Sequence, residues 1–114
     1  MRIEAYGFGK IRVDGRPYSS DLILYPDHIE SDWWRKQGHY LQIEDLSGLV
    51  GTPCDVLIIG TGAHGAMKVS GQVEAWLGER GIPWESHPTG RACDRYNALV
   101  DEGKRVVAAL HLTC

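Results

Sequence analysis

The first chemical signal in the sequence is a glycine motif that follows an apolar run. Residues 60–65 read Gly-Thr-Gly-Ala-His-Gly, which matches the pattern G-x-G-x-x-G, directly after the aliphatic residues 56–59. In dinucleotide-binding folds such glycines let the backbone turn tightly, so that its N–H groups approach a pyrophosphate at a helix N-terminus. Glu85, 25 residues after Gly60, stands where these folds place the acid that contacts the ribose. One hypothesis is therefore a nucleotide site at this loop.

Two observations weaken the nucleotide hypothesis. The helical pattern after the motif begins only at Val69, whereas in dinucleotide-binding folds the motif itself opens the helix. The chain also offers only three strands of the parallel type, while a complete dinucleotide fold needs two such halves. The alternative is that the glycines simply let the backbone leave the strand.

Further polar residues gather at the same predicted edge. If the strands that end at Gly60 and Ser86 are parallel neighbours, their loops leave the sheet on one edge, where ligand sites of α/β proteins form. An anion could bind there, with Thr89 and the free N–H groups of the next helix as donors and Arg91 as the counter-charge. The simpler alternative is a solvated Arg91 and an ordinary helix cap. The candidate ligand-binding residues are Gly60, Thr61, Gly62, His64, Glu85, His87, Thr89 and Arg91, with Lys68 on the same edge.

The cysteines and histidines give no catalytic or metal site. Cys93 falls near the start of a predicted helix with His87 as a conceivable base, but a cysteine that faces a sheet is more often a small buried apolar residue. A pair of His64 with Glu85 as general acid and base has no support from spacing. The five histidines form no H-x-H or H-E-x-x-H pattern. We therefore predict no catalytic residue, no metal and no cofactor.

Two adjacent tryptophans could form a contact with another protein. Successive side chains of a strand point to opposite faces, so one of Trp33 and Trp34 can enter the core while the other faces solvent. An exposed tryptophan is a common anchor of protein interfaces. The alternative is that it covers a sheet edge within the same chain.

The elements that position these residues differ between the two halves of the chain. The first third predicts antiparallel strands, because Lys10–Val13 alternates in polarity before a hairpin dipeptide at Asp14-Gly15. Further strands are predicted at residues 16–18, 22–25 and 28–33, with a short helix around residues 43–50.

The second half predicts strand, helix, strand, helix and strand in turn. Residues 55–59 are a strand buried on both faces, and helical stripes follow from Val69 to Gly81 and from the cap Thr89 to Gly103. Strands at residues 82–86 and 106–112 complete the pattern. We therefore predict one compact α/β domain over residues 1–114, whose mixed β-sheet combines an N-terminal antiparallel meander with a C-terminal β-α-β-α-β unit flanked by helices.

Composition excludes several classes of function. The chain has 114 residues and a net charge of −3, which gives no basic surface of the size that nucleic acids or acidic membranes need. The first residues lack the pattern expected of a signal or transit peptide, and no apolar run approaches the length of a membrane span. Three widely spaced cysteines favour free thiols and a reducing compartment. We expect a cytoplasmic monomer or weak homodimer that binds neither nucleic acid nor membrane.

The sequence resembles a known family along nearly its whole length. The motifs that carry the resemblance are IGTG at 59–62, ERGI at 79–82, Glu85, Thr89, Ala92, Tyr96-Asn97-x-Leu99, Glu102-Gly103 and 107–110, together with Gly9, Gly15, residues 18–20 and Trp33-Trp34. They look like the small α/β family of unknown biochemical function that includes the adipogenesis-associated domain protein and a mitochondrial respiratory complex I assembly factor. The resemblance implies one compact mixed-sheet domain and a role in assembly or regulation without an established reaction. It does not imply dinucleotide binding, because His64 and Gly65 lie outside the shared motif.

These observations lead to one preferred function and two alternatives. The preferred function is a non-catalytic module that binds a protein partner or supports assembly or regulation. The first alternative is a small nucleotide- or anion-binding enzyme that uses the cleft around residues 60–65, and the second is a structural subunit without any pocket.

Overall fold

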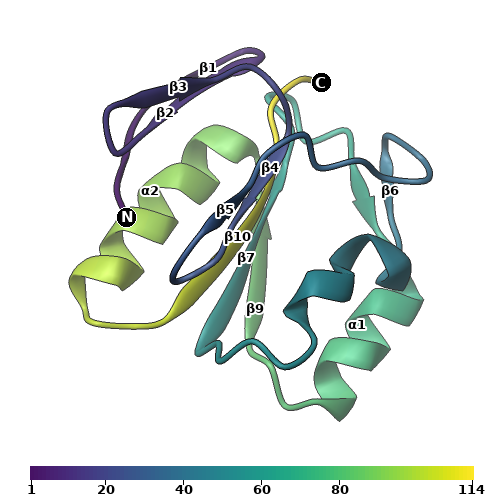
Figure 1. Cartoon of the computed structure of the whole chain (residues 1–114). Helices are drawn as coiled ribbons and strands as arrows, with labels where there is room; N and C mark the ends of the chain where they lie inside the picture. The colour runs from purple at the N-terminus through teal and green to yellow at the C-terminus, as the bar shows by residue number, and fades with distance from the viewer.

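A five-stranded mixed sheet forms the centre of the molecule. The computed structural model describes all 114 residues, and its main sheet has the strand order β5-β4-β10-β7-β9 (Figure 1). β10 and β7 are parallel over their whole length, and β9 is parallel to β7. β4 and β5 complete the other side of the sheet, where β4 is antiparallel to β10 and β5 is antiparallel to β4. The strands are β4 (Leu22–Leu24), β5 (Ile29–Glu30), β7 (Val56–Thr61), β9 (Trp84–His87) and β10 (Val106–His111).

Two smaller sheets and three helices surround the main sheet. The N-terminal meander is a three-stranded antiparallel sheet, and a two-stranded parallel pair joins two distant loops. The meander strands are β1 (Ile3–Gly7), β2 (Lys10–Val13) and β3 (Arg16–Tyr18), and the parallel pair is β6 (Tyr40–Leu41) with β8 (Lys68–Val69). The helices are the 3-10 helix η1 (Ile43–Leu49) and the α-helices α1 (Gly71–Glu79) and α2 (Thr89–Asp101).

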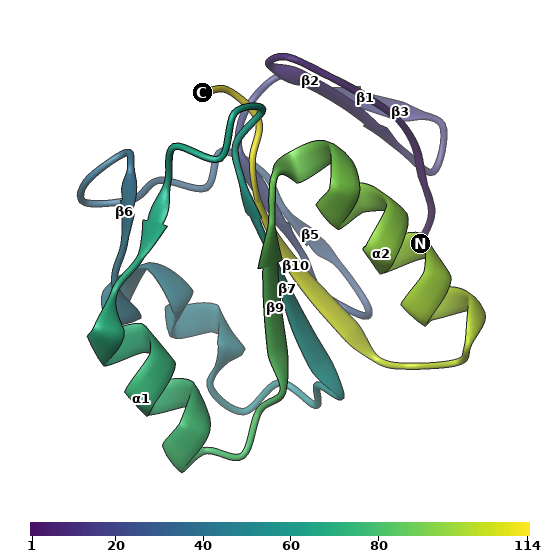
Figure 2. The ribbon, with the colours of Figure 1, turned by 180° about the vertical axis from the view of Figure 1, so that it is seen from behind.

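The helices cover the two faces of the sheet in separate layers. α2 lies on one face, with the meander packed beside it, and η1 and α1 lie on the other (Figures 1 and 2). All residues of β7 and β10 are buried, because each of these strands faces a helical layer on both sides. Alternate residues therefore enter two cores: Ile58 and Leu110 join the cluster under α2, whereas Ile59 and Ala109 join the cluster under α1 and η1.

Local signals in the sequence explain where the two α-helices begin and end. Ser70 caps α1 by accepting a hydrogen bond from the Val73 N–H at 3.1 Å. α2 buries Ala92, Tyr96 and Leu99, which recur at helical spacing, and Gly103 follows its end at a φ of +83°. No helix in the structure is long and apolar enough to cross a membrane.

The predicted architecture is confirmed, and several boundaries need correction. The expected strand at residues 28–33 is only Ile29–Glu30, because Asp32 adopts a positive φ of +55° and turns the chain. Val69 lies in β8 and not in the following helix, since the Ser70 cap requires extended backbone just before α1. Thr89 is the first residue of α2, and the capping position is occupied by Pro88. β1, β6 and β8 were not predicted from the sequence.

Candidate functional site

The predicted loops do meet at one edge of the main sheet, and Thr89 connects them. β7, β9 and β10 are parallel and all end there. The Thr89 hydroxyl donates to the His111 carbonyl at 2.5 Å and accepts the Gly62 N–H at 2.9 Å. Gly60 has no room for a side chain, because a Cβ atom would lie 2.9 Å from both the Leu110 and the Thr89 side chains. The edge is therefore tightly packed where the glycine motif begins.

The backbone of the glycine loop is bonded to the protein itself. The N–H groups of Ala63 and Ala66 each donate at 3.1 Å to the carbonyls of Thr113 and Cys114, and the Gly65 N–H donates to the Gly62 carbonyl. The N–H of Thr89, the first residue of α2, also donates to the Gly62 carbonyl at 3.0 Å. These donors are the ones that a phosphate cradle would use. The loop geometry is thus explained by its contact with the C-terminal segment.

The other candidate ligand-binding residues are only partly brought together. The Thr61 hydroxyl donates to the His87 carbonyl at 3.1 Å. His64, Lys68 and Arg91 are exposed, and none of them has an ion-pair partner. The His64 ring lies against Phe8, with 6.4 Å between ring centroids. Ligand binding by this set of residues stays a prediction.

Glu85 belongs to an ion-paired group that the sequence did not reveal. Its carboxylate accepts two hydrogen bonds from Arg95, at 2.8 and 2.9 Å, and lies 2.9 Å from His87 Nε2. The bonds from Arg95 and then from His87 lower the pKa of Glu85 to about 2. Arg95 was missed because it lies on the next helix, where only the fold places it opposite Glu85. A carboxylate held in this way links β9 to α2 and is a poor general acid.

A second polar cluster, also unpredicted as a group, lies buried at the end of β10. Arg35 Nη2 donates to Asp21 Oδ2 at 2.8 Å and to the Gly38 carbonyl at 2.9 Å, and His111 Nδ1 lies 2.8 Å from the same Asp21 oxygen. Arg35 and His111 are 7% and 4% exposed, so both are buried. No local pattern in the sequence indicates this cluster, because residues 21, 35 and 111 lie far apart along the chain.

Hydrogen bonding keeps the carboxyl of Asp21 ionised in this Asp21–Arg35–His111 cluster. Arg35 Nη2 lies within 2.9 Å of Asp21 Oδ2, the Gly38 carbonyl and His111 Nδ1, and Arg35 Nε donates to the same carbonyl at 3.1 Å. Burial raises the pKa of Asp21, but the hydrogen bonds from His111, the Leu112 N–H and Arg35 outweigh it, and the pKa is lowered overall. Asp21 is therefore an ionised carboxylate that fixes residues 33–41, hereafter the strap, against the end of β10.

The two tryptophans occupy opposite environments on the strap, as predicted. Trp33 is 5% exposed, its indole N–H donates to the Asp45 carbonyl at 2.9 Å, and the Arg35 guanidinium lies 4.7 Å from its ring. Trp34 is 76% exposed, more than any other large hydrophobic residue in the chain. Trp33 is thus a core residue, and only Trp34 is free to meet another molecule.

The remaining candidates for chemistry are the cysteines and the potential metal ligands. Cys93 is buried, and burial followed by the nearby charge of Asp94 raises its pKa to about 12, so it is not an activated thiol. All three cysteines are free. No group of three or more His, Cys, Asp or Glu side chains is arranged to hold a metal ion.

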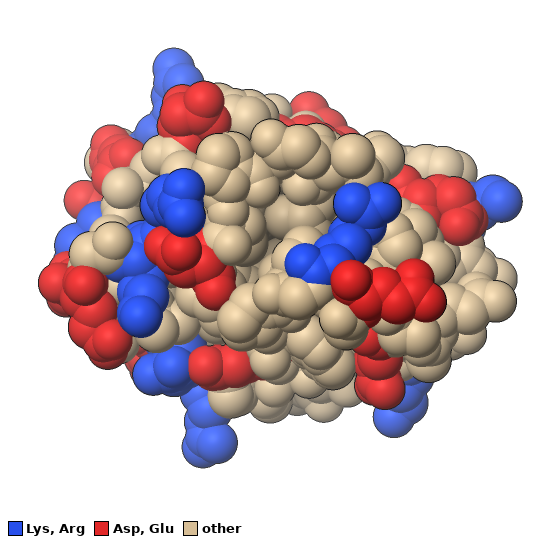
Figure 3. Space-filling view, turned by 90° about the horizontal axis from the view of Figure 1, so that it is seen from below, with Lys and Arg blue, Asp and Glu red and all other residues tan.

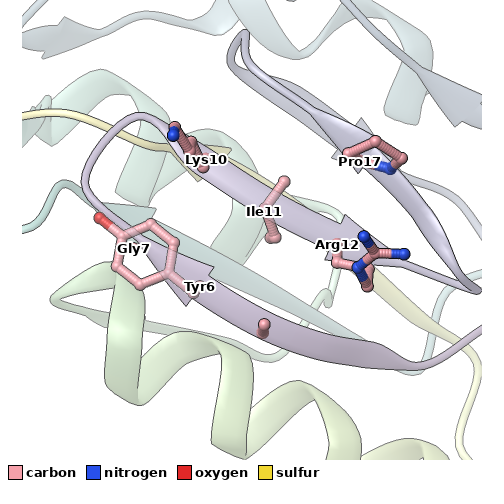
Figure 4. A pocket seen from close by; sticks show the side chains of 7 residues that line it. Tyr6, Gly7, Lys10, Ile11, Arg12 and Pro17 are labelled. Carbon is pink, nitrogen blue, oxygen red and sulfur yellow. The ribbon is translucent and has the colours of Figure 1, made fainter.

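The hollows on the surface have no lining residue from the glycine loop at residues 60–65. One of about 370 Å³ lies near Arg105 and the loops at residues 26–28 and 51–53. Acidic and basic side chains are interspersed on the face seen from below (Figure 3), so no single charge dominates there. Another hollow, of about 210 Å³, lies on the meander (Figure 4).

Comparison with known proteins identifies the family. Residues 3–111 match the model of a family described as "Protein of unknown function (DUF498/DUF598)". The chain belongs to this family. An uncharacterized protein of Rhodobacter capsulatus is 33% identical over 111 residues, which cover 96% of this chain and 83% of that protein. The resemblance found in the sequence to a family of unknown function is therefore confirmed.

Solved structures show the same fold in other proteins of this kind. A conserved hypothetical protein of Pyrococcus horikoshii OT3 is 27% identical, with a TM-score of 0.81 and 100% of both chains covered. An outer membrane protein of Bartonella henselae is 27% identical, with a TM-score of 0.83 over 98% of this chain and 94% of that one. A Bordetella pertussis protein described as a Mth938-like domain is 24% identical over 97% of this chain and 85% of that one, with a TM-score of 0.75. The mixed-sheet fold is thus that of the Mth938-like domains.

Proposed function

We propose that this chain is a non-catalytic binding module of the cytoplasm, which holds a protein partner in an assembly or regulatory role through Trp34. The observation that carries the proposal is a highly exposed indole on a fixed support. Exposed tryptophans supply much of the binding energy of protein interfaces, because one side chain buries a large apolar area. Free cysteines at all three positions suit a reducing compartment.

The support of Trp34 is rigid because both of its neighbours are buried. Trp33 is held by its indole hydrogen bond to Asp45, and Arg35 by its bonds to Asp21 and Gly38. The Lys36 N–H donates to Asp45 Oδ1 at 3.2 Å, which fixes the strap on the other side of Arg35. A preformed anchor loses little conformational entropy when it binds, which increases affinity. This arrangement favours partner binding over a purely structural role.

Photo-crosslinking from position 34 tests the proposal. A photoreactive phenylalanine analogue is placed at Trp34 and, as a matched control, at Val50, an apolar residue that is 55% exposed. The expected result in native cells is one discrete adduct from position 34 and none from position 50. Excess wild-type chain must suppress that adduct, whereas excess Trp34→Ala chain must not. Equal adducts from both positions, or equal suppression by both chains, would refute the role of Trp34.

A further inference from the structure

The outer face of the meander carries a hollow whose floor is made of small residues. Lys10 and Arg12 are exposed on β2, while Ile11 and Val13 between and after them are buried, so the two basic side chains share the outer face. Their partners in the neighbouring strands are Gly7 for Lys10, and Ala5 and Pro17 for Arg12. Small partners leave the hollow of about 210 Å³ beside the two basic side chains (Figure 4).

The positive charges at this hollow are not neutralised within the chain. Residues 1–18 contain four basic and two acidic side chains, although the whole chain has a net charge of −3. Among the four, only Arg2 forms an ion pair, with Asp101 at 3.0 Å. Glu4 and Asp14, the two acids, accept backbone N–H groups of Gly15 and Arg2. Lys10 and Arg12 therefore face solvent without a carboxylate partner.

The hollow is partly organised before any ligand arrives. Arg12 Nη1 donates to the Gly15 carbonyl at 2.8 Å, which fixes one arm of the guanidinium and leaves the rest free. Lys10 and Arg12 are two residues apart on one strand, so their Cα atoms lie roughly 7 Å apart, close to the spacing of alternate side chains in an extended peptide.

From this arrangement we propose that the outer face of the meander binds an extended acidic segment of a partner protein. Carboxylates at alternate positions of that segment pair with Lys10 and Arg12, and the small floor lets its backbone approach the sheet. This site is distinct from Trp34, so it goes beyond the proposed function and can be tested separately from it.

The test measures binding of a fluorescent octaglutamate peptide to the full chain. Binding is followed by fluorescence polarisation at low and at moderate salt. Wild-type chain is expected to bind octaglutamate but not octalysine, with affinity falling as salt rises. The double variant Lys10→Glu/Arg12→Glu is expected to weaken binding at least tenfold. The matched control is Arg80→Glu/Lys104→Glu, which makes the same change in net charge at two exposed basic side chains without ion pairs and is expected to weaken binding less than threefold.

Three outcomes would overturn the proposal. The first is absence of octaglutamate binding at low salt, and the second is equal weakening by the two charge-reversal variants, which would show non-specific attraction. The third is displacement of the peptide by millimolar inorganic phosphate, which would assign the hollow to a phosphate group. Trp34→Ala is expected to bind octaglutamate like wild type, so a failure here and a failure of the Trp34 proposal are distinguishable.

Discussion

Single residues at the carboxyl edge of the sheet are fixed by close backbone contacts. Gly62 has a φ of +108°, and a Cβ atom there would collide with the Thr113 carbonyl. Thr89 uses its one hydroxyl both as donor, to β10, and as acceptor, from the loop after β7. Residues that a motif search assigns to phosphate binding thus have a structural explanation in this chain, and stability measurements can separate the two roles.

Substitution of Gly62 is expected to be among the most destabilising changes in the loop. Gly62→Ala should lower the free energy of unfolding by about 3 kcal/mol, because an unfavourable φ and a steric clash add together. Gly15→Ala is the matched control, because Gly15 has a φ of +77° but open space where a Cβ atom would lie. The free energy of unfolding of this variant should fall by only about 1 kcal/mol. Urea unfolding of both variants measures the difference. Equal losses would show that the clash with Thr113 does not exist.

The Glu85–Arg95 pair predicts a defined pH dependence. Glu85 has a pKa of about 2 in the folded state against an ordinary value of 4.5, so its contribution to stability is present above pH 4.5 and is lost as the pH falls towards 2. The gap in urea midpoint between wild type and Glu85→Gln should therefore be largest above about pH 5 and close as the pH falls from 4.5 to 2. Glu79→Gln, at an exposed glutamate without an ion pair, controls for the loss of one charge. A gap that does not change with pH would contradict the pairing.

At the level of elements, the strap has too little regular structure to hold itself in place. Its only ladder is the two-residue parallel pair of β6 with β8. The strap is otherwise held by the buried side chains of Trp33 and Arg35 and by the backbone N–H groups of Trp33 and Lys36. Asp21, just before β4, ties the strap, β4 and β10 together, because its carbonyl accepts the Trp33 N–H and its carboxylate binds Arg35, His111 and the Leu112 N–H. The position of Trp34 therefore depends on the half-buried carboxylate of Asp21 as well as on the bonds to Asp45.

Loss of the Asp21 charge should loosen the strap before the rest of the fold. Asp21→Asn is expected to lower the free energy of unfolding by about 3 kcal/mol, because it leaves the Arg35 charge buried without its partner. Amide hydrogen exchange should accelerate at Trp33 and Tyr40 while α2 stays protected. Asp27→Asn, which removes an exposed carboxylate paired with His28, serves as the control and should leave strap exchange unchanged. Uniform acceleration over the whole chain would instead show that the cluster acts on global stability alone.

Elements with a strong local pattern could be predicted, and those held by distant partners could not. The aliphatic runs of β7 and β10 and the apolar stripe of α2 are visible in sequence because burial on fixed faces demands them. β6 and β8 are two residues long and exist only through each other. The backbone N–H and carbonyl of Ile3 in β1 form hydrogen bonds with the side-chain amide of Asn97 in α2, which lies 94 residues later in the sequence. The same limit hid Arg95 and Arg35, whose carboxylate partners are set by topology.

For the molecule as a whole, the order of strands in space differs from their order in sequence. β10 is the last strand along the chain, yet it lies in the middle of the main sheet, between β4 and β7. It therefore joins the N-terminal antiparallel half to the parallel half and contributes to both cores. The two halves seen in the sequence form one cooperative unit only when this strand is in place.

The central position of β10 predicts that residues 1–103 cannot fold alone. Without β10, β4 and β7 lose their shared neighbour, and the five apolar residues 106–110 leave the two cores. We expect the shortened chain to show no cooperative thermal transition and no near-UV circular dichroism. A chain of residues 1–112 is the control: it loses only the carbonyls that accept the Ala63 and Ala66 N–H groups, so it should fold and unfold cooperatively at a lower temperature than the full chain. A cooperative transition in residues 1–103 would mean that the two halves are stable without β10, contrary to the sheet order.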